Sequence, residues 1–106
     1  MRKRFATLLV MLSLLAGHAG ASDALATRYT CVACHHAERK VLGPSWKDVA
    51  AKYADGRKTV DELAESIRKG STGQWGAVAM PAQPRVSSAE ARALAEWVLA
   101  RPAGTP

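Results

Sequence analysis

Cys31-Val32-Ala33-Cys34-His35 is the stretch of sequence that decides the fold of this chain. Its pattern is C-x-x-C-H, which is the attachment pattern of c-type haem. The two thiols are spaced to form thioethers with the vinyl groups of one porphyrin, and the imidazole that follows is a ligand that suits haem iron. The stretch therefore predicts one covalent haem c, with Cys31 and Cys34 as tethers and His35 as an axial ligand of the iron.

A C-x-x-C pair alone has two other interpretations, a thioredoxin-like redox pair and half of a zinc site. The redox pair requires a surrounding βαβ pattern, which the sequence does not show. A zinc site requires further ligands, but Cys31 and Cys34 are the only cysteines, and His18 lies in a segment that we expect to be removed. Both alternatives are weaker than haem attachment.

Residues 1–21 have the organisation of a secretory signal peptide. A basic start, Arg2-Lys3-Arg4, precedes an apolar run from Phe5 to Ala16, and Ala19-Gly20-Ala21 fits a cleavage site before Ser22. The apolar run is too short to span a bilayer comfortably, so an uncleaved membrane anchor is the less favoured alternative. We expect an exported, periplasmic protein without a membrane anchor.

The remaining residues, 22–106, make a single domain of 85 residues with twelve basic and nine acidic side chains, a net charge of +3. Few aromatic residues, the absence of a basic stripe and the export signal argue against nucleic-acid binding. A chain this short buries little apolar surface and often needs a staple. With both cysteines assigned to haem, the haem itself is expected to form the core.

Hydrophobic periodicity predicts an all-α domain of about four helices wrapped around the haem. The expected starts are Ser22 or Asp23, Ser45, Thr59 and Ser87, and the last two open capping boxes with Glu62 and Glu90. Expected stops are Gly43-Pro44, the Asp55-Gly56 turn, Gly70 and Pro102. The apolar faces comprise Leu25, Tyr29 and Val32; Trp46, Val49, Ala50 and Tyr53; Val60, Leu63, Ala64 and Ile67; and Leu94, Trp97 and Val98.

Met80 is the candidate for the second axial ligand. It is the only methionine after the predicted leader, and it lies in a Gly- and Pro-rich loop, residues 71–85, that has no helical face for it to complete. His36 neighbours the proximal ligand and would point away from the far side of the iron. Core packing is the alternative for Met80, but His/Met ligation is a known arrangement of haem iron.

The chain resembles the short bacterial class I cytochromes c, close to the cytochrome c-551 type, over nearly all of residues 22–106. The resemblance rests on the haem motif together with Gly43-Pro44, residues 47–52, Gly70-Ser71, Trp75-Gly76, Met80-Pro81 and residues 95–99. It implies the cytochrome c fold. It also implies that the Pro44 carbonyl accepts the His35 ring N–H, and that the Trp75 indole N–H reaches a haem propionate. For Pro44 and Trp75, punctuation of the chain and simple packing are the alternatives.

The function implied by the resemblance is electron transfer, not catalysis: a soluble, monomeric carrier of single electrons in the periplasm. Implied partners are nitrite reductases, oxidases or peroxidases as acceptors, and a membrane quinol-oxidising complex as donor. Lys40, Lys47 and Lys52 are candidates for charge-steered docking, with a merely solvated face as the alternative. Rival functions are a haem enzyme or gas sensor with an open distal site, and a haem subunit of a larger complex.

Three departures from the family pattern stand out. Ser66 occupies a position where relatives often carry an arginine near the propionates. The stretch formed by residues 83–85 is one residue longer than in the family pattern. Ala77, Ala79 and Ala82 replace some of the prolines that the pattern has around the methionine. The source of positive charge near the propionates is therefore an open question from the sequence.

Overall fold

A computed structural model of the chain describes residues 18–101, with side chains from Ser22 onward. Within these residues the secondary structure is entirely helical apart from two isolated bridges, which confirms the predicted all-α class. The elements are α1 (His18–Arg28), the 3-10 helix η1 (Cys31–Ala33), α2 (Trp46–Lys52), α3 (Val60–Lys69) and α4 (Ser88–Leu99). Most of the predicted signal peptide, residues 1–17, and the predicted stop at Pro102 lie outside the described residues.

Both predicted capping boxes are present and explain where α3 and α4 begin. The Thr59 hydroxyl accepts the backbone N–H of Glu62, whose carboxylate accepts the Thr59 backbone N–H in return. Ser87 and Glu90 make the same reciprocal pair at α4. Each box satisfies two N–H groups that have no partner inside the helix.

Helix α2 is short, and its start is held by the loop that follows the haem motif. Buried Ser45 caps it by accepting the Asp48 N–H at 3.0 Å. The N–H groups of Trp46 and Lys47 donate to the carbonyls of His36 and Ala37. This loop therefore ties α2 directly to the segment that carries His35.

The first helix differs from the prediction. A continuous helical face through Leu25, Tyr29 and Val32 is wrong, because α1 ends at Arg28 and Thr30 adopts a left-handed conformation with φ of 60°. The chain changes direction there before η1 begins. As a result Val32 does not join the core and is 50% exposed.

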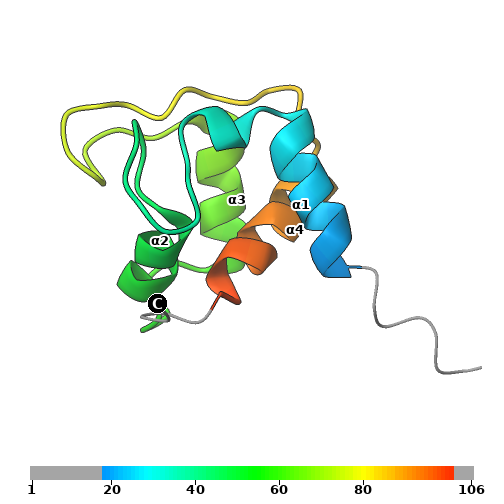
Figure 1. Ribbon diagram of the computed structural model, residues 1–106, viewed down its shortest axis with the longest axis horizontal. Coiled ribbons are helices and arrows are strands. Elements are labelled where there is room, and N and C mark those ends of the chain that lie inside the picture. Colours follow the sequence, from blue (N-terminus) through cyan, green and yellow to red (C-terminus); the bar gives the residue numbers. More distant parts are fainter. Residues whose placement is uncertain (1–17, 102–106) are drawn as a thin grey trace, which may run out of the picture.

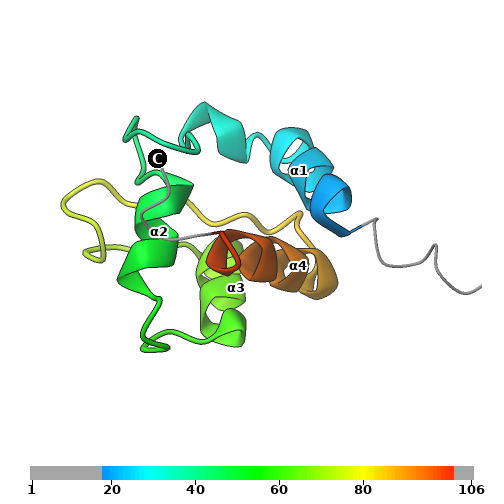
Figure 2. The ribbon, with the colours of Figure 1, turned by 60° about the horizontal axis from the view of Figure 1, so that its bottom comes forward.

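Helix α4 lies at the centre of the packing and contacts α1, α2 and α3 (Figures 1 and 2). The main core gathers around its buried residues Ala91, Leu94 and Ala95, together with Ala26 of α1 and Ala64 of α3. Small side chains at these positions let the helices approach closely and pack densely. The predicted core role of Leu94 is confirmed, and the small residues form the contact between helices.

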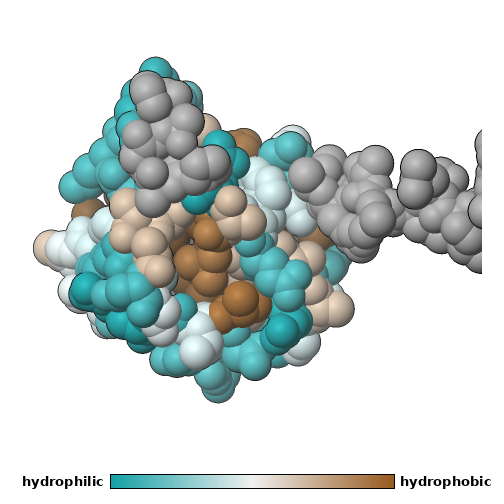
Figure 3. Space-filling view, turned by 90° about the horizontal axis from the view of Figure 1, so that it is seen from below, coloured by the Kyte–Doolittle hydropathy of each residue, from teal (hydrophilic) through white to brown (hydrophobic). Residues whose placement is uncertain are grey.

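A second apolar cluster joins α2 to the end of α4 through Val49, Tyr53 and Val98, with Trp46 and Trp97 packed against it. The two tryptophan rings meet edge to face with centroids 4.7 Å apart. The loop between α3 and α4 runs along the top of the molecule in the view of Figure 1. On the opposite face, hydrophilic side chains surround a small apolar patch (Figure 3).

Candidate functional site

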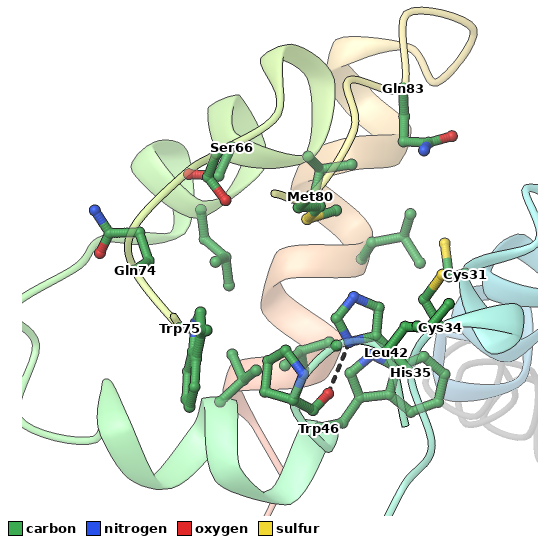
Figure 4. Close-up of a pocket in the computed structure, with 18 of the residues that line it drawn as sticks. Cys31, Cys34, His35, Leu42, Trp46, Ser66, Gln74, Trp75, Met80 and Gln83 are labelled. Carbon is green, nitrogen blue, oxygen red and sulfur yellow. Dashed lines mark hydrogen bonds between the residues drawn. The ribbon is translucent and has the colours of Figure 1, made fainter. Parts of the chain in front are cut away.

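A cavity of about 400 Å³ lies between the helices. Two long loops also line it, one between η1 and α2 and the other between α3 and α4. This volume is within the range of sites that bind small molecules and cofactors. Side chains from every helix and from both loops line it, and most are apolar. The lining includes all six predicted site residues: Cys31, Cys34, His35, Pro44, Trp75 and Met80. Residues that are far apart in the sequence thus meet around one cavity (Figure 4).

Cys31 and Cys34 lie together at one end of the cavity (Figure 4). The tight turn of η1 is closed by Ala33 N–H to Thr30 O and Cys34 N–H to Cys31 O hydrogen bonds. Residues three apart in a 3-10 turn eclipse one another, so both thiols are presented on one side. Both cysteine side chains are partly buried.

The His35 ring lines the cavity, and one of its two nitrogens makes a hydrogen bond to the backbone. Its Nδ1 lies 2.7 Å from the Pro44 carbonyl oxygen, which is the contact that the family resemblance implies. A carbonyl can only accept, so Nδ1 carries the proton and Nε2 keeps its lone pair for a ligand. Figure 4 shows this ring directed into the cavity. The imidazole is thus set in the tautomer that binds a metal.

Gly43 makes room for the His35 ring. A Cβ at position 43 would lie 2.6 Å from Cε1 and 3.0 Å from Nδ1 of the ring. The Gly43 N–H also donates to the Cys34 carbonyl at 2.9 Å, which closes the loop back on the haem motif. From the sequence, Gly43 is predicted only as a break in the chain, and nothing in the local pattern indicates this contact.

The Met80 thioether approaches from the wall opposite the His35 ring (Figure 4). Its backbone pairs with Ser71 through two hydrogen bonds of 2.9 and 3.0 Å. Beyond it, the Gln83 N–H donates to the Ile67 carbonyl of α3 at 3.1 Å. The methionine loop is therefore fastened to the end of α3 at Met80 and again at Gln83.

Gly70 allows that attachment. Its φ of 82° and ψ of 173° belong to a region open almost only to glycine. A Cβ at this position would lie 2.7 Å from the Met80 carbonyl oxygen and 2.9 Å from the Ala82 nitrogen. The predicted helix stop at Gly70 is confirmed, and the close approach to Met80 is an added role.

Trp75 lies at the end of the cavity away from the cysteines (Figure 4). Its ring meets the Tyr53 ring edge to face, with centroids 6.2 Å apart. The Lys52 ammonium lies 4.2 Å from the Trp75 centroid and donates to the Gln74 carbonyl. These contacts hold the tip of the loop against α2.

The fold and the donor set bear on the alternatives for the cysteine pair. The described residues contain no cluster of three or more His, Cys, Asp or Glu side chains suited to a metal ion. They also contain no strand from which a βαβ unit could be built. The residues present fit a haem: an apolar cavity, two thiols at one end, and a nitrogen and a sulfur on facing walls.

The chain is similar to a family model and to several known cytochromes. A family model described as "Cytochrome C oxidase, cbb3-type, subunit III" matches residues 18–98. Cytochrome c-552 of Nitrosomonas europaea is 50% identical over 86 residues, covering 81% of this chain and 84% of the relative. Cytochrome c-552 of Hydrogenobacter thermophilus is 48% identical over 92 residues, with 87% and 93% covered. This chain belongs to the class I cytochromes c.

The solved structures agree with this assignment. The crystal structure of Nitrosomonas europaea cytochrome c552 matches with a TM-score of 0.70 and 49% identity, covering 73% of this cytochrome and 95% of that chain. This cytochrome carries one covalently attached haem c with its iron, and it is an electron-transfer protein. Among residues 18–101, no helix is both long and apolar enough to cross a membrane.

Proposed function

We propose that His35 and Met80 are the two axial ligands of the haem iron and that the protein carries single electrons without catalysing a reaction. The observation that supports this most directly is geometric. The His35 ring and the Met80 thioether face each other across the cavity, with Cys31 and Cys34 at one of its ends (Figure 4). His/Met ligation fills both axial positions and favours the ferrous state.

Haem iron, when bound, supplies the one-electron couple between its ferrous and ferric states. The protein's residues do the rest. Cys31 and Cys34 tether the porphyrin, the Pro44 carbonyl orients His35, and Met80 closes the distal side against water. Apolar walls from α2, α3 and α4 keep solvent away from the metal. A site closed in this way passes electrons and has no open position for a substrate.

We further propose that the protein is a monomer and works in the periplasm; the signal-peptide pattern of residues 1–21 supports the periplasmic location. The proposed acceptors are nitrite reductases, oxidases or peroxidases. The proposed donor is a membrane quinol-oxidising complex. Comparing the rates at which purified complexes of these classes reduce or oxidise the protein would identify the partners. Failure of every one of them to exchange electrons with it would contradict this assignment.

The test of the closed site is the reaction of the reduced protein with carbon monoxide. With Met80 bound to the iron, we expect little or no binding at neutral pH and a weak far-red absorption band in the ferric protein. Ready binding of carbon monoxide by the unmodified protein would instead favour a haem enzyme or gas sensor with an open distal position.

A haem subunit of a larger complex is the second candidate, because the matching family model is described as an oxidase subunit. Against it, the chain covers 92% of cytochrome c-551 of Pseudomonas aeruginosa, a protein of similar length. Gel filtration of the native periplasmic extract separates the two. A monomeric elution volume supports the carrier, whereas co-elution with a large assembly supports the subunit.

Of the three lysines considered for docking to a redox partner, we propose Lys40 as the main one. Lys47 approaches Glu38 at 4.0 Å, and Lys52 is bound to the Gln74 carbonyl, so both already have contacts in the fold. Lys40 is exposed, and it lines the cavity beside His35. We expect Lys40→Gln to slow association with a redox partner at low salt more than Lys69→Gln does. Rates that do not respond to ionic strength would contradict charge steering.

A further inference from the structure

The two ends of the cavity meet chemically different edges of the porphyrin. In haem the two carboxylate side chains lie on the edge opposite the vinyl groups. Cys31 and Cys34 fix the vinyl edge at one end of the cavity, so the carboxylates are directed to the other end. Figure 4 shows Gln74 and Trp75 at that end. The residues around Trp75 are therefore the surroundings of two negative charges.

Carboxylates that are partly removed from water require cations or hydrogen-bond donors beside them. From the family resemblance, an arginine is expected at the position of Ser66. Here the Ser66 hydroxyl donates to the Glu62 carbonyl of its own helix at 3.2 Å. Ser66 lines the cavity but adds no charge. Another residue must take that part if the carboxylates are to be neutralised.

Lys58 is placed where it can neutralise the haem carboxylates. It lines the cavity, its side chain is half-buried, and its ammonium lies 5.4 Å from the centroid of the Tyr53 ring. Tyr53 in turn contacts Trp75 edge to face, which places Lys58 at the carboxylate end. Within residues 18–101, no carboxylate side chain forms an ion pair with Lys58. The nearby Asp55 is paired with Arg57 at 2.8 Å.

The Tyr53 hydroxyl gives a second, independent indication. Tyr53 is 5% exposed and lines the cavity, yet its hydroxyl is buried without a hydrogen-bond partner in the described part of the chain. A buried hydroxyl left without a partner is destabilising. An acceptor is therefore expected beside this ring, and a carboxylate is a strong one.

We infer that Lys58 neutralises the haem carboxylates at the Trp75 end of the cavity, a part that the uncharged Ser66 side chain does not supply. Lys52 has a different part, since its ammonium is bound to the Gln74 carbonyl and holds Trp75 in place. The inference rests on the covalent haem of this family and does not depend on which side chain ligates the distal side of the iron.

The test is the reduction potential of the holoprotein measured against pH. A carboxylate near the iron stabilises the ferric form, and a neighbouring cation offsets this and holds the carboxyl pKa low. Removing the cation in Lys58→Gln should lower the potential and make it depend on pH between about pH 5 and 8, as the carboxyl pKa rises toward that window. Lys69→Gln removes the same charge from an exposed i,i+4 pair and should leave the profile unchanged.

A rescue completes the design. Adding Ser66→Arg to Lys58→Gln should bring the potential and its pH profile back toward wild type, because an arginine at a cavity-lining position of α3 restores the cation. A Lys58→Gln profile that matches Lys69→Gln would overturn the inference and leave Lys58 as a side chain that packs on Tyr53. The far-red band of each variant reports the Met80 ligand separately, so a failure of the proposed ligation is seen independently.

Discussion

Replacing Gly70 by alanine should release the methionine loop from α3. Position 70 has φ of 82° and ψ of 173°, where a non-glycine residue costs about 1–3 kcal/mol. The new Cβ would also lie 2.7 Å from the Met80 oxygen and 2.9 Å from the Ala82 nitrogen. Both are backbone atoms that cannot rotate away, and relieving such overpacking costs about 1–3 kcal/mol more. We expect a total destabilisation of about 2–6 kcal/mol, against a whole stability of about 5–15 kcal/mol.

Gly73→Ala is the matched control. Gly73 lies in the same loop with a φ of 74°, but a Cβ there meets no atom within 4 Å. It should therefore cost only the backbone strain, about 1–2 kcal/mol. Denaturant unfolding followed by far-ultraviolet circular dichroism gives both free energies, and the far-red band reports the iron–sulfur bond. If Gly70→Ala is no less stable than Gly73→Ala and keeps its band, the close contact at Met80 is not a constraint on the loop.

Three other predictions follow from the site and the helix caps. Met80→Ala should lower the reduction potential and abolish the far-red band while the haem stays attached; an unchanged potential and band would reduce Met80 to packing. A protein with Cys31 and Cys34 both changed to alanine should be largely unfolded without haem, and a cooperative melt of a helical apo-protein by circular dichroism would refute this. The backbone N–H of Ser87 lowers the pKa of Glu90 in the folded state, so its stabilising contribution is present above the unfolded pKa and is lost as pH falls through the folded value. Glu90→Gln should therefore reduce the loss of unfolding free energy at acid pH. If the unfolding free energies of the variant and the wild type differ by the same amount at every pH, this prediction is contradicted.

Much of this protein is determined by local sequence. The haem motif needs only five consecutive residues, because two thioethers and one ligand can be presented by a single turn of chain. The caps at Thr59 and Ser87 also act within four residues, so the starts of α3 and α4 follow directly from the sequence. The contact between His35 and Pro44 spans nine residues, and the family resemblance rather than any pattern pointed to it.

Other features could not be seen in the hydrophobic pattern. The early end of α1 depends on the left-handed turn at Thr30, a residue type that rarely adopts it, so periodicity extended the helical face wrongly to Val32. The core alanines Ala26, Ala91 and Ala95 were not among the predicted apolar faces, since close packing of helices selects for small shape and not for strong hydrophobicity.

The same holds for the site. Gly43 and Gly70 are recognisable in sequence as chain breaks, but only the folded chain shows that one backbone lies against the His35 ring and the other against Met80. The sequence showed that Ser66 lacks a charge; the tertiary structure brings Lys58 into the lining of the cavity beside Tyr53. The physical reason is common to all these cases. Covalent attachment and helix capping are short-range interactions that consecutive residues encode, whereas the shape and charge of a cavity arise from side chains that only the packing of α2, α3 and the loops brings together.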